Sequence, residues 1–299
     1  MVGEWLWAVF TVSAAGAQTM RNAMQKELTA SLGTVGATHV RFLFGLPFGC
    51  LFLVAVSLVI GEQPSLPPLN SLAWTAVGAG AQFGATALML AAMNSRSFLV
   101  VIAYTKTEPV LVLIFAVVFL SELPTAVVVV AVVVATVGVL AMSWPAERVP
   151  RGDTLKTSAL GIGSGALFAL SAVSYRGGIQ TSGAEHFVMA ASTTLVVALA
   201  MQAASVTGLL VLRNRATLIE ILRLWRPSMT AGFLGALASQ FWFLAFALQN
   251  PASVRTLGLV EILFAQAVSR RLFKQRTSRL EMLGILLLIA GVILILTGR

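Results

Sequence analysis

Ten stretches of mainly apolar residues dominate the 299-residue sequence. A bilayer core of about 30 Å requires a helix of roughly 20 such residues, which is close to the length of these stretches. Only 10% of the residues are charged, whereas a soluble domain has about 25%. The chain is therefore predicted to be an all-α integral membrane protein with ten transmembrane helices and no attached soluble domain. The stretches cover residues 5–20, 34–60, 71–93, 98–120, 124–144, 158–178, 186–211, 227–248, 252–270 and 279–296.

The positions of the positive charges predict how these helices are oriented. A net charge of +9 would suggest a nucleic-acid partner for a soluble protein, but 15 of the 20 Lys and Arg residues lie in connections that follow odd-numbered helices. Cytoplasmic loops carry the excess of Lys and Arg. The charge pattern thus predicts a multi-pass protein of the inner cell membrane whose two termini face outward. The expected surroundings are the lipid bilayer, with no nucleic-acid partner.

The sequence also contains an internal repeat. A shift of 153 residues (261 − 108) superimposes Glu108 on Glu261 and Gly138 on Gly291. The repeat predicts two five-helix halves, residues 1–145 and 158–299, joined by a loop over 146–157. Because five is an odd number, the second half enters the membrane in the opposite sense, which gives inverted repeats. Such repeats are typical of secondary transporters, in which one central site is exposed to alternate sides.

Charged residues interrupt the fourth apolar stretch in the segment AYTKTEPV, which begins at Ala103. Glu108 falls in the middle of that stretch, and Glu261 falls at the matching place in the ninth. Lys106 cannot neutralise Glu108 directly, because residues two apart on a helix do not face each other. Pro109 has no N–H group and is predicted to open the helix beside Glu108. Three glutamines on other stretches are candidate polar partners for these charges: Gln82, Gln240 and Gln266.

These intramembrane charges have two interpretations. An ionised group at the centre of a spanning helix costs about 2.5 to 3.5 kcal/mol, so such residues generally line a site or a hydrated cavity. Alternatively, Glu108 and Glu261 are protonated and hydrogen-bonded to neighbouring helices as packing contacts. Trp242, in the middle of the eighth stretch, either stacks on a substrate or fills space. His39 and Arg41 are expected at the membrane interface.

Arg255 lies in the first turn of the ninth stretch. It is expected to be interfacial or to attract substrate rather than to be deeply buried.

The sequence resembles the drug/metabolite transporter superfamily, specifically the ten-helix exporters with two EamA domains. The resemblance rests on TEPVLVLIFAVVFLSELPT, on VATVGVLAM, and on the copy GLVEILFAQAVSRRLFKQRTSRLEMLGILLLIAGVIL in the second half. The copy departs from the first half, since Ile262 replaces Pro109 and Gln275 replaces Glu122. The resemblance implies export of metabolites or drugs. It also implies that both termini lie in the cytoplasm, against the charge pattern.

Together these features predict a secondary transporter that exports small polar metabolites such as amino acids, by alternating access at a midplane cavity. Glu108 would bind a cationic group of the substrate or a coupling proton, and Glu261 would supply the matching acid. Lys106 would bind an anionic group. Tyr104 and Trp242 would contact apolar parts, and Gln240 would form a hydrogen bond. The alternatives are an exchanger of phosphorylated or nucleotide-linked metabolites, an efflux pump for cationic drugs, and a non-transporting scaffold.

Enzymatic chemistry is not expected. The chain has a single aspartate, Asp153, so a two-aspartate protease is excluded, and it has no HExxH zinc motif. No GxxxxGK[ST] segment is present for ATP hydrolysis. We therefore expect a small-molecule substrate, with no cofactor and no metal. The oligomeric state is not determined by the sequence, which is compatible with a monomer.

Overall fold

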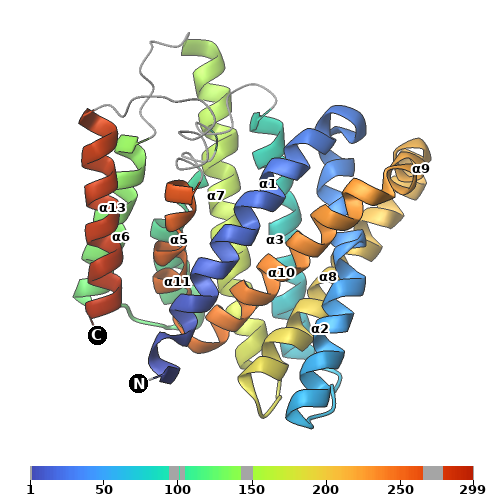
Figure 1. Cartoon of the computed structure of the whole chain (residues 1–299), viewed down its shortest axis with the longest axis horizontal. Coiled ribbons are helices and arrows are strands. Elements are labelled where there is room, and N and C mark those ends of the chain that lie inside the picture. The colour runs from blue at the N-terminus through green and yellow to red at the C-terminus, as the bar shows by residue number, and fades with distance from the viewer. Residues whose placement is uncertain (1, 94–100, 102–104, 143–150, 265–278, 299) are drawn as a thin grey trace. The chain divides into compact units, whose positions relative to one another are not determined.

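The computed structural model of the chain describes residues 2–93, 101, 105–142, 151–264 and 279–298 (Figure 1). Over this part of the chain the protein is 89% helical and has no strand, so the all-α prediction is confirmed. Six of its helical segments are long and apolar enough to cross a membrane, and two shorter helices are also apolar. The structure therefore supports a membrane protein with about six apolar helices, while the ten-helix inverted repeat stays a prediction.

The helices follow the apolar stretches for most of the chain. They are α1 (Val2–Leu43), α2 (Gly45–Ile60), α3 (Leu69–Met93), α5 (Glu108–Leu120), α6 (Ala126–Met142), α7 (Arg151–Gln180), α8 (Phe187–Arg213), α9 (Arg215–Arg223), α10 (Trp225–Leu248), α11 (Pro251–Leu257) and α13 (Arg279–Thr297).

By packing, the chain divides into two compact units. The first unit comprises Met1–Phe83 and Ser174–Gln249, and the second comprises Gly84–Val173 and Asn250–Arg299. Each unit combines segments from both predicted halves of the sequence. Because this grouping reflects packing rather than ancestry, the boundaries of the sequence repeat stay a prediction.

In the first unit, α1 and α10 pack along each other, with α2 and α8 beside them. The ring centroids of Phe10 and Phe241 lie 6.0 Å apart, and those of Tyr175 and Phe243 lie 4.4 Å apart. Gly232 of α10 lies directly against Phe44, where an added Cβ atom would be only 2.6 Å from the backbone carbon. The aromatic contacts join α10 to α1 and to α7 (Arg151–Gln180), and the close approach at Gly232 holds it against the segment that joins α1 to α2.

Residues 21–33, which the sequence predicted as a connection, are helical and belong to α1. The helix bends at Gly33, whose φ of 66° is accessible to glycine without steric cost. The buried polar residues in this segment have partners within the protein. Arg21 donates a 2.6 Å hydrogen bond to Asn22, and Gln25 donates one of 2.9 Å to the carbonyl oxygen of Ala37. These polar residues therefore pack inside the protein, whereas Lys26 and Glu27 of the same helix are exposed.

His39 and Arg41, which were expected at the membrane interface, are buried within the protein. Their exposed fractions are 0% and 2%. The Nε2 atom of His39 lies 2.9 Å from the hydroxyl of Thr207, and Arg41 donates to the hydroxyl of Ser239 at 3.5 Å. Polar partners on α8 and α10 thus allow both residues to lie inside the first unit.

In the second unit, α6 and α13 are in backbone contact along their length (Figure 1). A Cβ atom on Gly284 would be 2.5 Å from the carbonyl oxygen of Gly138, and one on Gly291 would be 2.8 Å from the nitrogen of Ala135. The same Cβ on Gly291 would be 2.9 Å from the carbonyl oxygen of Ala131. Small residues at such positions allow membrane helices to approach closely.

The α6–α13 contacts have a symmetry that matches the sequence repeat. Under the shift of 153, Gly138 corresponds to Gly291 and Ala131 to Gly284. Exchanging the two helices therefore turns the Gly138–Gly284 contact into the Ala131–Gly291 contact, and both are present. This is the relation that two inverted copies of one helix would give, and it supports the predicted repeat at this pair of helices.

Candidate functional site

The first feature of the candidate site is a break in the fourth apolar stretch. Lys106 and Thr107 form a turn, and α5 begins at Glu108 with Pro109 in its first turn. Pro109 has no N–H to donate to the preceding turn, so the predicted opening of the helix at this point is confirmed. A Cβ on Gly165 of α7 would be 2.9 Å from the carbonyl oxygen of Thr105. The break therefore packs directly against the backbone of α7.

A second break interrupts the ninth stretch, which was predicted as one continuous helix over 252–270. Helix α11 ends at Leu257, a turn follows at Gly258, and the chain is helical again from Val260. Glycine is about 1 kcal/mol less favourable than alanine in a helix interior, which explains why the helix ends here. Glu261 lies directly after this break, just as Glu108 lies after the first.

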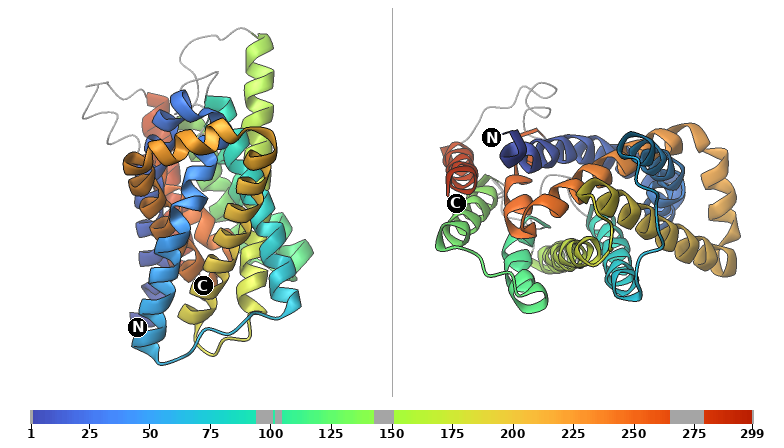
Figure 2. Two further views of the ribbon diagram at one scale, coloured as in Figure 1. Left: turned by 90° about the vertical axis from the view of Figure 1, so that its right-hand side faces the viewer. Right: turned by 90° about the horizontal axis from the view of Figure 1, so that it is seen from below.

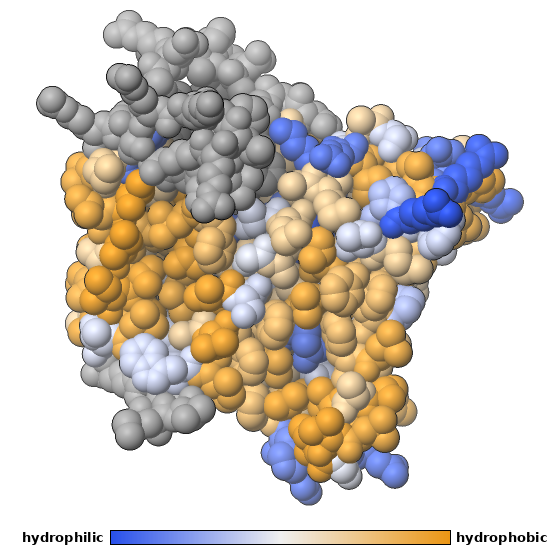
Figure 3. All heavy atoms as spheres, viewed as in Figure 1, coloured by the Kyte–Doolittle hydropathy of each residue, from blue (hydrophilic) through white to orange (hydrophobic). Residues whose placement is uncertain are grey.

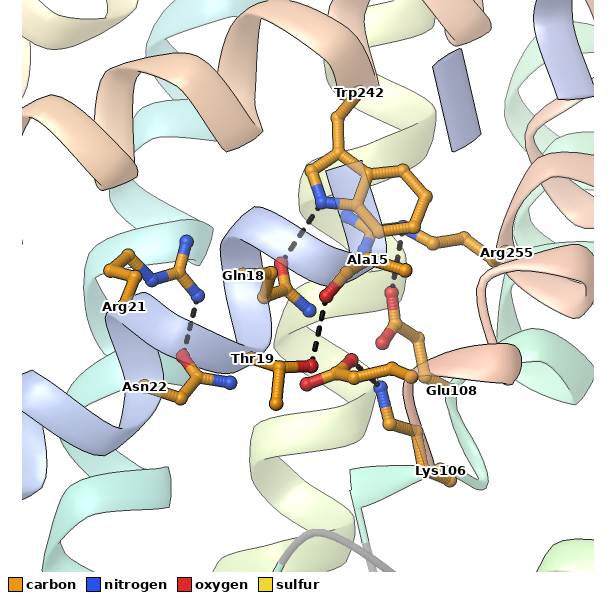
Figure 4. Close-up of polar contacts among 10 residues, drawn as sticks. Ala15, Gln18, Thr19, Arg21, Asn22, Lys106, Glu108, Trp242 and Arg255 are labelled. Atoms are coloured by element: carbon orange, nitrogen blue, oxygen red, sulfur yellow. Dashed lines mark hydrogen bonds and ion pairs between the residues drawn. The ribbon is translucent and has the colours of Figure 1, made fainter. Parts of the chain in front are cut away.

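Two buried ion pairs join the broken helices (Figure 4). The Nζ atom of Lys106 lies 2.6 Å from an oxygen of Glu261. The Nε atom of Arg255 lies 3.0 Å from an oxygen of Glu108, without the alignment of a hydrogen bond. Exposed fractions of the four side chains are between 1% and 9%. The carboxylates, for which the sequence suggested a water-filled cavity, a substrate charge or glutamines, therefore have cationic partners within the protein.

The pairs are crossed between the two predicted halves. Lys106 of the first half contacts Glu261 of the second, while Arg255 of the second contacts Glu108 of the first. The acids occupy equivalent positions in the repeat, but the cations do not, since Lys106 corresponds to Leu259. The cluster contains two positive and two negative side chains and is electrically balanced.

The energetic importance of this balance follows from burial. Desolvating a charge is costly, and removing one member of a buried pair leaves the other uncompensated at a cost of about 3 to 5 kcal/mol. A group that replaces a cation or an anion of the cluster must therefore bring the same charge. This requirement allows the cluster to select ligands by charge.

A second contact ties the same helices at another point. Asn250 caps α11 by accepting a 2.8 Å hydrogen bond from the N–H of Ala252, as the Asn250–Pro251 sequence indicates. Its amide nitrogen donates to Glu122, just beyond the end of α5, at 2.6 Å. Asn250 therefore links the start of one broken helix to the end of the other.

Of the six residues predicted for the site, the structure brings Lys106, Glu108 and Glu261 together in the second unit. Tyr104 lies outside the described residues. Gln240 and Trp242 belong to the first unit, where they donate hydrogen bonds to Ser192 (2.8 Å) and to Gln18 (3.0 Å, Figure 4).

The residue that sequence reasoning misplaced is Arg255. Its side chain is 8% exposed and paired with Glu108, so the expectation that it is not deeply buried is wrong. Charge counting could have found it. The fourth and ninth stretches each contain one acid near the middle, and Lys106 can neutralise only one of them, which points to Arg255 in the ninth stretch as a second inward-facing cation.

Part of the chain matches a known family. Residues 5–144 match the EamA-like transporter family, which belongs to the drug/metabolite transporter superfamily. Members of this family are membrane transporters rather than enzymes. The second predicted EamA domain lies outside the matched residues. The search of curated proteins found no match.

One solved structure, titled only "Crystal structure of protein", shares the fold. It superposes with a TM-score of 0.70 over 98% of this chain and 95% of its own, at 11% sequence identity. At this identity the similarity shows the fold alone.

Proposed function

We propose that the chain is a secondary transporter, independent of ATP, that exports small polar metabolites such as amino acids by alternating access. The observation that carries the proposal is the crossed pair of buried ion pairs at two helix breaks in the second unit. Broken helices with charges at the break are the usual sites of substrate and ion binding in transporters. The EamA-like match over residues 5–144 supports transport as the general activity.

The charge balance of the cluster favours a zwitterionic substrate. An amino acid carries one ammonium and one carboxylate, which can replace one cation and one anion of the cluster without leaving a charge uncompensated. In this proposal Glu108 and Glu261 bind the ammonium, and Lys106 and Arg255 bind the carboxylate. The roles of Tyr104, Gln240 and Trp242 stay predictions from the sequence.

The alternatives require a different charge balance. A phosphorylated or nucleotide-linked substrate calls for more cations than acids, and a cationic drug calls for more acids than cations. The cluster has two of each. We therefore rank both alternatives below a zwitterion, and a non-transporting scaffold below all three.

The crossed pairs also suggest how binding is linked to movement. Each pair joins one predicted half of the chain to the other, so both must loosen when the halves rearrange. A bound zwitterion satisfies the released charges during that step. A proton on Glu108 would release Arg255 in the same way, which is how a proton gradient would drive export.

The decisive experiment measures transport by the purified chain in lipid vesicles. Vesicles loaded with one unlabelled amino acid are tested for uptake of the same labelled compound, across a panel of zwitterionic, phosphorylated and cationic solutes. We expect exchange of at least one zwitterion and at least a tenfold loss in Glu108→Gln. Glu122→Gln is the matched control and should retain exchange, because it removes a charge outside the cluster and its amide oxygen can still accept the hydrogen bond from Asn250. Exchange of only phosphorylated or cationic solutes would contradict the substrate class.

A further inference from the structure

The connection between α8 and α10 contains a helix that the sequence analysis did not predict. Helix α9 (Arg215–Arg223) begins after Asn214, which accepts a hydrogen bond from the N–H of Thr217 at 3.3 Å. It lies across the ends of α8 and α10 in the first unit (Figure 2). Because both neighbours are long and apolar enough to span a membrane, we expect α9 to lie at a membrane surface.

One face of α9 is fixed against the protein. Ile221 is fully buried. A Cβ on Gly36 of α1 would be 2.8 Å from a methyl group of Thr217 and 3.8 Å from the end of Ile221. This contact determines which side of α9 points outward.

The opposite face presents two apolar residues flanked by two arginines. At 100° per residue, Arg215, Ile219, Leu222 and Arg223 fall within about 100° of one another around the helix. Ile219 is 53% exposed and Leu222 56%, and the side chain of Arg223 is 73% exposed. A helix with apolar and basic residues side by side on its outer face is typical of segments that lie in the headgroup region of a bilayer.

The neighbouring residues extend this surface. Leu212 is 85% exposed and Trp225 50%, and the guanidinium of Arg226 lies 5.5 Å from the centre of the Trp225 ring. Figure 3 shows hydrophilic and hydrophobic atoms side by side over this part of the molecule. We define the α9 surface as Arg213, Arg215, Ile219, Leu222, Arg223, Trp225 and Arg226.

The charge of this surface indicates the chemistry of its partner. Four arginines stand against one acid, Glu220, so residues 213–226 carry a net charge of +3. Helix α8 has 27 residues and is about 40 Å long, so its other end is at the opposite membrane surface. That end has Glu62, Glu185 and His186, and no such group of arginines in the described residues. Of the two ends of α8, only the end next to α9 therefore has the positive charge needed to bind anionic headgroups.

We propose that the α9 surface binds the phosphate headgroups of anionic phospholipids, such as phosphatidylglycerol, in one leaflet. The arginines contact the phosphates, while Ile219, Leu222 and Trp225 enter the boundary of the acyl chains. The exposed apolar residues favour a lipid over free phosphate, because an inorganic anion leaves them in water. This inference does not depend on the proposed transport function.

The test compares the lipid preference of the full chain with that of variants. Native mass spectrometry of the protein with phosphatidylglycerol and phosphatidylcholine gives the ratio of their association constants. One arginine near an anionic surface contributes about 1 kcal/mol, a factor of about five. We therefore expect the double variant R215Q/R223Q to lower the ratio at least tenfold. Lys26→Gln, which changes an exposed charge elsewhere in the first unit, should leave the ratio within twofold.

Two further measurements are needed. The first changes the lipid preference in the opposite direction to R215Q/R223Q, and the second distinguishes a lipid headgroup from free phosphate. Glu220→Gln frees Arg223 from its 3.5 Å ion pair and should raise the preference for phosphatidylglycerol. Inorganic phosphate should neither compete with the lipid nor protect the protein from unfolding. A preference that is unchanged in R215Q/R223Q, or full protection by inorganic phosphate, would overturn the proposal.

Discussion

Two pairs of helices in the second unit are related by the same 153-residue shift, yet they pack in different ways. Helices α6 and α13 meet through glycine and alanine, and their contacts are unchanged when the two helices are exchanged. The broken helices that contain Glu108 and Glu261 meet through charges whose cations, Lys106 and Arg255, occupy unrelated positions. The sequence repeat is thus retained in the backbone contacts between α6 and α13 but not in the ion pairs between the broken helices.

This difference indicates where the two predicted halves have diverged. A close contact at glycine depends only on the absence of a side chain, so α6 and α13 can pack through equivalent positions. An ion pair requires a cation of suitable length and position, and Leu259 stands where the second half would need a counterpart of Lys106. The asymmetric pair is therefore the better candidate for function, and the symmetric pair for a fixed interface.

The largest effect should come from breaking one ion pair. Glu261→Leu leaves Lys106 buried without its carboxylate and should lower the free energy of unfolding by about 3 to 5 kcal/mol. The double variant K106M/E261L removes both charges and should recover most of this loss, while transport stays absent. The measurement is unfolding of the purified protein in mixed micelles. A double variant as unstable as the single one would show that pairing is not the cause.

A smaller effect should come from the symmetric pair. Gly284→Ala places a methyl group 2.5 Å from the carbonyl oxygen of Gly138, and overpacking of this kind costs about 1 to 3 kcal/mol. Gly208→Ala on α8 is the control, since nothing lies within 4 Å of its added methyl. It should be neutral or stabilising because alanine favours helix. Equal stability of the two variants would contradict the close backbone contact.

The smallest effect concerns the contact between Glu62 and His186, which lies outside the membrane-spanning segments. Burial raises the pKa of the Glu62 carboxyl, but hydrogen bonds from the backbone N–H of Glu185 and from the ring and N–H of His186 outweigh it. The pKa therefore lies below its ordinary value of 4.5. A lowered pKa stabilises the fold above the unfolded-state value, and this stability is lost as pH falls below 4.5 through the folded-state pKa.

The unfolding temperature of the wild type should therefore decrease from pH 5 to pH 3 slightly more than that of Glu62→Gln. Identical decreases in the two proteins would indicate that the Glu62 contacts do not contribute to stability.

The sequence predicted features that depend on local chemistry. Pro109 interrupts the fourth apolar stretch, Asn250 caps α11, and most of the apolar stretches form helices. Each of these outcomes follows from neighbouring residues. It did not predict the burial of His39, Arg41 and Arg255. Hydropathy does not distinguish a polar residue near the membrane interface from one whose partner comes from a distant helix. Helix α9 was missed for a similar reason, since its short apolar face is completed by contact with Gly36 of α1.

Asn250 has a mechanical consequence. The two broken helices are fastened to each other at their breaks by the ion pairs, and again at the outer end of α5 by the Asn250 side chain. While both sets of contacts are in place, the two broken helices are held together as one body. In the proposed cycle, in which the ion pairs loosen, the contact of Asn250 with Glu122 would still join the two broken helices, and shortening the Asn250 side chain would allow them to separate.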